Sequence, residues 1–239
     1  MRYFLTLFFM FCLGFITWSK ASAGDMADSV YTGSMGSVVV QAYHPFEMPL
    51  WSTIGGGVLV RRYSPLYSGS QPKFAILTAF HVADVSSEGY YLRACSMLDM
   101  EKCVSLGSYI SSSTSYLTSE DWAIMPISEY PEGMKPVRIR RGSPPHTGEE
   151  VIIIGQPFGH AFLSSGIVSY SGTDMAGTYY IINGFAAPGS SGGGVFDKYG
   201  RLVGLVSAIE VHPDPVFSIE YYRTYNSMVI VVPISHADL

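Results

Sequence analysis

The sequence predicts an all-β protein built as two six-stranded antiparallel β-barrels, and three observations lead to this prediction. Aromatic residues make up 14% of the 239 residues and charged residues another 14%, without the Ala/Glu/Lys/Leu bias of helical proteins. Apolar or alternating runs recur between turn signals, and no convincing amphipathic helix interrupts them. A polar connection with several prolines and glycines, residues 128–150, divides these runs about equally.

The predicted strands follow one another along the chain in runs of about five to ten residues. They are residues 37–43, 56–63, 74–80, 90–95, 122–127, 137–140, 150–155, 165–172, 178–184, 193–197, 201–209 and 227–235. We place the first barrel in residues 24–135 and the second in residues 136–239. No period of 20 to 50 residues repeats, so a solenoid is not indicated.

The N-terminus has the pattern of an export signal over residues 1–23. Arg2 precedes an apolar run, residues 3–18, and Ala21-Ser22-Ala23 forms a small-x-small cleavage site. The alternative is an uncleaved membrane anchor, but the run is shorter than the roughly 20 residues that a spanning helix needs. We therefore expect a secreted or periplasmic protein that begins near Gly24 and has no stable membrane insertion.

Cleavage removes Cys12 and leaves two cysteines, Cys95 and Cys103, on facing arms of a short predicted hairpin. In an oxidising compartment such a pair is expected to form a disulfide. The alternative, a metal site, lacks further ligands at suitable spacing, so we predict a structural disulfide and no metal.

The segment "APGSSGGGVFD", residues 187–197, indicates a backbone cradle around Ser191. A serine nucleophile needs a base and donors for the oxyanion that forms on attack. Glycines permit the sharp turn that points two N–H groups at one spot, and the candidate donors are those of Gly189 and Ser191. An isolated Gly/Ser run is more often a turn or linker, so this assignment depends on finding partners for the serine.

His81, in "FAILTAFHVAD", follows a strand that looks buried, which would hold an imidazole base rigidly. The other histidines lie in polar or Pro-flanked segments, and we interpret them as surface residues: His44, His146, His160, His212 and His236.

Asp121, in "SEDWAIMPI", opens an apolar strand, and its carboxylate would accept the second ring N–H of His81. Asp84 and Glu120 are rival partners. The chain order His81, Asp121, Ser191 is one of the known orders of the serine triad, with the base and carboxylate in the first half and the nucleophile in the second.

The three segments "LTAFH", "DWAIM" and "GSSGG" resemble the signature segments of trypsin-like serine proteases. The second half is more similar to the HtrA/Deg type, because "GEEVIIIGQPFGHAFLSSGIVSYSG" and "APGSSGGGVFDKYGRLVGLVSAI" match that group's pattern. The resemblance covers residues 37–233. It implies a chymotrypsin-like double barrel with the active site in the cleft between the barrels.

The sequence departs from these families at three points. About 48 residues follow Ser191, room for the second barrel but not for the PDZ domain that HtrA proteins usually carry. Gly194 stands where proline is usual, which would loosen the loop. Ser190 stands where digestive trypsins have an aspartate that pairs with a new N-terminus, so we expect no such zymogen switch.

By resemblance, the substrate pocket is lined by residues just before the nucleophile and by the strand that follows it. Its predicted lining residues are Phe185, Ala187, Ser207 and Ile209. No acidic residue lies in residues 184–187, so we expect a preference for small or medium apolar side chains at the cleaved bond.

These features predict a serine endopeptidase that acts on proteins or peptides through an acyl-enzyme and uses no cofactor. One alternative is a binding protein of the same fold whose cleft is blocked, for example by Ile209 or Phe185. An esterase is less consistent, because an α/β-hydrolase carries its serine before its histidine. The net charge of −5 gives no electrostatic case for nucleic acid.

Overall fold

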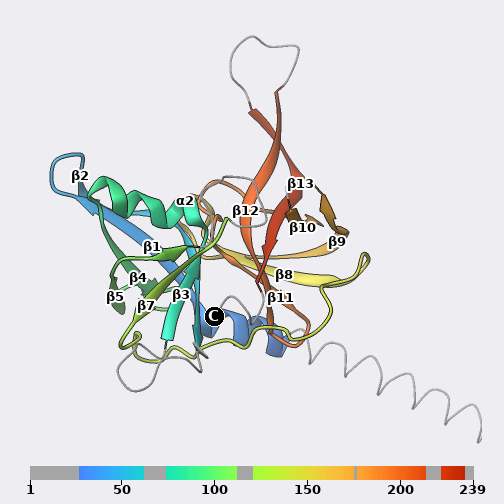
Figure 1. Cartoon of the computed structure of the whole chain (residues 1–239), viewed down its shortest axis with the longest axis horizontal. Helices are drawn as coiled ribbons and strands as arrows, with labels where there is room; N and C mark the ends of the chain where they lie inside the picture. Colours follow the sequence, from blue (N-terminus) through green and yellow to red (C-terminus); the bar gives the residue numbers. More distant parts are fainter. Residues whose placement is uncertain (1–26, 62–73, 112–120, 175–176, 214–221, 235–239) are drawn as a thin grey trace, which may run out of the picture.

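Two β-sheets, one from each half of the chain, dominate the structure (Figure 1). It is a computed structural model that describes residues 27–61, 74–111, 121–174, 177–213 and 222–234. The expected all-β fold, with the architecture of a chymotrypsin-like double barrel, is confirmed. The predicted signal peptide, residues 1–23, lies outside the described residues.

The first half forms one seven-stranded antiparallel sheet with the order β5-β4-β1-β2-β3-β7-β6. Its strands are β1 (Ser37–His44), β2 (Met48–Arg61), β3 (Phe74–Thr78), β4 (Tyr91–Ser96), β5 (Cys103–Leu106), β6 (Ile110–Ser111) and β7 (Ala123–Ile127). The central strands β1 and β3 are almost entirely buried, which explains why they are apolar runs without alternation. Within the described residues this sheet remains open, whereas six strands closed into a barrel were expected.

A disulfide joins Cys95 of β4 to Cys103 of β5, as predicted. The two residues face each other in the register of the antiparallel pair. The bond therefore fastens β5, which ends the sheet on this side, to the strand beside it.

The second half closes into a barrel with the strand order β10-β13-β12-β11-β8-β9. Its strands are β8 (Glu150–Gly155), β9 (Phe162–Asp174), β10 (Gly177–Asn183), β11 (Gly194–Asp197), β12 (Leu202–Pro213) and β13 (Tyr222–Pro233). A 3-10 turn, η2 (Pro157–Gly159), separates β8 from β9. Strands β12 and β13 continue as a two-stranded arm beyond the barrel (Figure 1).

The two halves share one cluster of buried side chains, and each sheet also has a cluster of its own. The shared cluster takes Val58 and Leu77 from the first sheet, Trp122 from the position before β7, and Ile154 and Phe196 from the barrel. The chain between Ile127 and Glu150 crosses from one sheet to the other, and within it the predicted strand 137–140 forms only isolated bridges.

Helical structure is sparse but more extensive than the sequence indicates. Residues 27–36 form a helix whose Gly33 approaches Phe196 so closely that a Cβ would come within 3.2 Å of the ring. Its two glycines, Gly33 and Gly36, obscure the helical pattern in the sequence. Two further helical segments, α2 (Phe80–Ala83) and η1 (Asp84–Glu88), follow β3.

Candidate active site

His81 lies in the first turn of α2, immediately after β3. Its neighbours Phe80, Val82 and Ala83 are buried, and they fix the short helix against the sheet. The imidazole is partly exposed, with 25% of its side-chain surface accessible. The residue is thus anchored by its surroundings while its ring reaches the surface.

Asp121 precedes β7, and its side chain is 1% exposed. The His81 Nδ1 atom lies 3.0 Å from Oδ2 and 3.2 Å from Oδ1, and the His81 backbone N–H donates to Oδ1 at 3.2 Å. The rival Asp84 instead accepts hydrogen bonds from Tyr109 Oη at 2.8 Å and from Ser87. Glu120 lies outside the described residues. The structure therefore pairs His81 with Asp121.

Ser207 of β12 also donates a hydrogen bond from its hydroxyl to Asp121 Oδ2. The carboxylate thus receives donors from both halves of the molecule. The β12–β13 register shifts between Val206 and Ala208, so Ser207 sits at a β-bulge. A bulge re-aims a side chain out of the strand's alternation. That is why the run "RLVGLVSAI" did not indicate this contact.

The loop before β11 makes a tight turn around Ser190. The Ser190 N–H donates to the Ala187 carbonyl at 2.9 Å, and Gly189 has a φ of +95°, which together are typical of a type II turn. The Ser190 hydroxyl accepts a hydrogen bond from the Ala187 N–H at 3.2 Å. Ser190 is buried at 3% exposure, whereas Ser191 is only partly buried.

Two runs of three glycines, residues 55–57 of β2 and residues 192–194, bring the halves together backbone to backbone. The Gly56 N–H donates to the Ser191 carbonyl at 2.7 Å, and Thr78 Oγ1 donates to the Gly56 carbonyl at 2.7 Å. A Cβ at Gly192 would overlap both the Gly56 carbonyl and Thr78 Oγ1, and Gly192 has a φ of +79°. This contact sets the Ser191 loop beside the end of β3, from which His81 follows.

The role of residues 55–57 was missed because glycines inside a strand, here β2, carry no chemical signature of their own. The available signal was that the sequence has two triglycine runs, 55–57 and 192–194. Glycine inside a strand often marks a place where another backbone approaches closely.

Gly194 belongs to the strand rather than to the loop. It pairs with Leu205 and Ile154, and a Cβ there would come within 2.8 Å of Val58 Cγ2. The absence of proline at this position therefore leaves it paired on both sides and closely packed, whereas a looser loop was expected.

The residues predicted to line a substrate pocket have different surroundings. Phe185 packs against Phe162 with ring centroids 4.8 Å apart, and Ala187 is buried. The Ser207 hydroxyl contacts Asp121, which a pocket role alone did not predict. The side chain of Ile209 lies outside what the structure describes, so the pocket stays a prediction.

The described ranges contain no group of three or more His, Cys, Asp or Glu side chains placed to hold a metal ion. Within the same ranges, no helix has the length and apolar character needed to cross a bilayer.

The sequence matches a known protein family. Residues 55–205 match the model of the trypsin-like peptidase domain. No match was found among curated proteins.

Solved structures with the same fold include an HtrA-type protease and a serine endoprotease. The HtrA-type protease AlgW with a tripeptide aligns over 87% of this chain and 59% of its own, with a TM-score of 0.61 and 18% identity. The serine endoprotease from Yersinia pestis aligns over 87% of this chain and 62% of its own, with a TM-score of 0.60 and 18% identity. The chain thus spans about three-fifths of the length of these structures. The chain belongs to the trypsin-like peptidase domain family and has an HtrA-type fold.

Proposed function

We propose that the protein is an active serine endopeptidase in which Ser191, His81 and Asp121 form the catalytic triad. The observation that carries the proposal is the contact of both Asp121 oxygens with His81 Nδ1, at 3.0 and 3.2 Å. A carboxylate accepts and does not donate, so Nδ1 carries a proton and Nε2 is the basic nitrogen. Asp121 holds that tautomer and stabilises the imidazolium that forms during catalysis.

The reaction has two stages, acylation and deacylation, and His81 transfers the proton in both. Ser191 Oγ attacks the carbonyl carbon of the scissile bond as its proton passes to His81 Nε2, and the carbonyl electron pair moves onto oxygen. The intermediate collapses with cleavage of the C–N bond, and the imidazolium donates its proton to the leaving amine. Water then attacks the acyl-enzyme by the same route, which releases the acid and restores the Ser191 hydroxyl.

The backbone N–H groups of Gly189 and Ser191 are the proposed oxyanion donors. Support comes from the Gly189 φ of +95°, which is typical of a type II turn. In a type I turn the Pro188–Gly189 peptide would be flipped, so the Gly189 N–H would point the opposite way. The hydrogen bonds around Ser190 hold this turn without an ion pair. We therefore propose that the enzyme needs no proteolytic trimming of its mature chain for activity.

We also propose peptides or proteins as substrates, cleaved after small or medium apolar side chains by an exported enzyme. The AlgW structures contain a tripeptide and a decapeptide, which fits this substrate class. The proposed apolar preference rests on Phe185 and Ala187 and on the lack of acidic residues in 184–187. A peptide-library profile dominated by cleavage after Lys or Arg would reject the preference.

Labelling with a fluorophosphonate probe tests the nucleophile directly. Wild-type protein should be labelled and Ser191→Ala should not, while the matched control Ser169→Ala, an exposed serine of β9, should be labelled normally. Absence of labelling in the wild type would favour the alternative, a protease-fold binding protein with a blocked site.

A further inference from the structure

A surface cavity of about 580 Å³ lies between the two sheets at the strand ends remote from His81, and its walls are rich in arginine. It is lined by Arg61, Pro136, Val137, Arg138, Ile139, Arg141 and Arg201. Four of the nine arginines of the chain meet here although the net charge is −5. None of these lining residues carries a carboxylate.

The backbone sets three of these arginines in register. Val137 forms a parallel bridge with Val60, so the following residues, Arg138 and Arg61, lie next to each other. Ile139 forms a parallel bridge with Leu202.

The second bridge extends the row to the barrel. Since Ile139 is paired with Leu202, the preceding residues, Arg138 and Arg201, are also neighbours. The Leu202 N–H donates to the Arg138 carbonyl at 2.8 Å, which fixes this register. Arg138 therefore lies between the arginine that ends β2 and the arginine that directly precedes β12.

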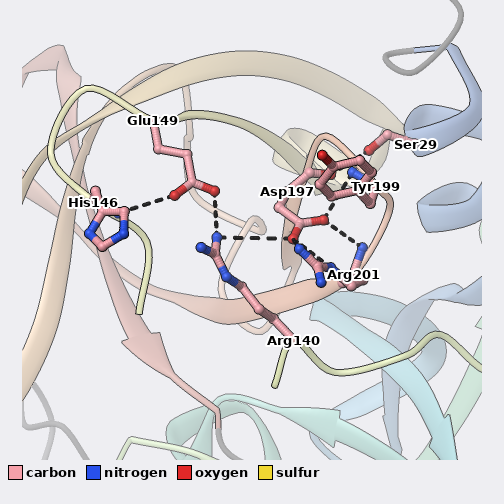
Figure 2. Close-up of polar contacts among 7 residues, drawn as sticks. All are labelled: Ser29, Arg140, His146, Glu149, Asp197, Tyr199 and Arg201. Carbon is pink, nitrogen blue, oxygen red and sulfur yellow. Dashed lines mark hydrogen bonds and ion pairs between the residues drawn. The ribbon is translucent and has the colours of Figure 1, made fainter. Parts of the chain in front are cut away.

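The row is only partly neutralised by carboxylates. Figure 2 shows Asp197 between two arginines. The Asp197 Oδ2 atom lies 2.6 Å from Arg201 Nη2 and 4.0 Å from Arg140 Nη1. Arg140 is also paired with Glu149. These contacts hold Arg201 in place at the cavity wall.

Arg61 and Arg138 have no such carboxylate partner among the described residues. Arg61 is exposed and lies over the Phe74 ring at 5.9 Å, and Arg138 is exposed at the centre of the row. Like charges held side by side repel each other, and an anion between them would relieve that repulsion.

We propose that this cavity, the arginine row of Arg61, Arg138 and Arg201, binds a phosphate-type anion with more than one phosphate group. Guanidinium groups match phosphate oxygens in a two-pronged geometry, which favours this ligand over a simple halide. The cavity is larger than one phosphate requires. No aromatic residue is among the described residues that line it, so this part of the wall offers no stacking surface for a nucleobase.

The site is remote from the proposed nucleophile. Gly56, which contacts Ser191, lies five positions before Arg61 in β2, or roughly 17 Å of extended chain. A ligand in the arginine row would hold the first sheet, the connecting segment and the barrel together. Its binding should therefore raise the thermal stability of the protein.

The experiment is titration of the full mature chain with inorganic pyrophosphate at low ionic strength, followed by calorimetry and thermal melting. Wild-type protein should bind and melt at a higher temperature, and affinity should fall at least tenfold in Arg138→Gln and further in the Arg61→Gln/Arg138→Gln double variant. Arg138→Lys keeps the positive charge but loses the two-pronged guanidinium geometry, so its pyrophosphate affinity should lie between those of the wild type and Arg138→Gln. The matched control Arg93→Gln removes an arginine that stacks on Trp51 elsewhere and should bind normally.

Two further arms identify the source of the phosphate and the limits of the proposal. Co-sedimentation with phosphatidylglycerol vesicles, but not with phosphatidylcholine vesicles, and its loss in the double variant would assign a lipid headgroup. Pyrophosphate binding without vesicle binding would assign a free phosphate ligand. Equal affinity for citrate, no pyrophosphate binding by the wild type, or unchanged binding by a folded Arg138→Gln variant would overturn the proposal.

Discussion

The two halves of the molecule carry different residues of the proposed triad, and their sheets differ. One sheet is closed into a barrel and the other is open within the described residues. The barrel of the second half is closed, so each of its strands is paired on both sides, whereas the described sheet of the first half ends at β5 and β6. The disulfide occurs in the open sheet, on the strand that ends it. A closed barrel removes free edges by its own hydrogen bonds, and the open sheet has a covalent bond at one of them. Breaking each half in turn therefore tests what each one contributes.

The largest effect should come from changing Asp121, whose carboxylate contacts His81 of the first half and Ser207 of the second. Asp121→Asn should lower kcat/KM about 10⁴-fold, because an amide no longer selects the required imidazole tautomer. Most of the loss should be in kcat, as measured with a peptide substrate. Asp84→Asn is the matched control, since Asp84 contacts Tyr109, and a comparable loss there would contradict the assignment.

The glycine contact between the halves should show the next largest effect. Gly192→Ala combines a positive φ with backbone overlap, so unfolding should become easier by about 3–5 kcal/mol. Gly133→Ala separates the two causes, because Gly133 has a φ of +83° but no atom within 4 Å of its Cβ position. It should lose only about 1–2 kcal/mol in denaturant unfolding. Equal losses in the two variants would show that the backbone contact contributes nothing.

Removal of the disulfide should affect the first half selectively. With Cys95 and Cys103 eight residues apart, loop closure predicts a loss of about 2–3 kcal/mol. Hydrogen exchange should accelerate in β4 and β5 and remain slow in β8 and β11. Reductant should reproduce this result in the wild type and have no effect on a Cys95→Ala/Cys103→Ala variant, whereas uniform acceleration through the barrel would contradict it.

The smallest effect is an acid-dependent one in the second half. Burial raises the pKa of Glu149, but hydrogen bonds from Arg140 and from the His146 backbone outweigh burial and leave it below its ordinary value. A lowered pKa in the folded state stabilises the protein above the ordinary carboxyl pKa, and this stabilisation is lost as the pH falls through the folded value.

Glu149→Gln should therefore reduce the unfolding free energy at neutral pH by less than about 1 kcal/mol. The difference from the wild type should shrink in acid. Glu150→Gln, a change at the exposed neighbouring residue, is the control. An equal pH dependence in both variants would refute the role of the Arg140 pair.

The sequence predicts the elements and the chemistry better than it predicts the contacts between halves. The apolar runs correctly indicated the central strands, because local burial decides them. The setting of His81 and Asp121 favoured their contact but left Asp84 and Glu120 as rivals, and the structure distinguishes His81–Asp121 from His81–Asp84. The position of Cys95 and Cys103 on facing hairpin arms likewise sufficed for the disulfide.

Features that depend on long-range register could not be predicted in this way. Ser207 reaches Asp121 through a bulge, and a bulge depends on the partner strand rather than on the residue itself. The row of arginines arises from two isolated bridges between segments far apart in the chain. The helix of residues 27–36 is stabilised by packing on the barrel, which its own glycines do not signal.

The hydrogen bond from Gly56 to the Ser191 carbonyl also makes one amide proton a natural reporter. That proton belongs to the first sheet, yet its acceptor is the proposed nucleophile's own backbone, so it becomes accessible to solvent when the halves separate there. In an NMR spectrum the exchange rate of the Gly56 amide would read out the docking of the nucleophile loop, without a label, an inhibitor or a substrate.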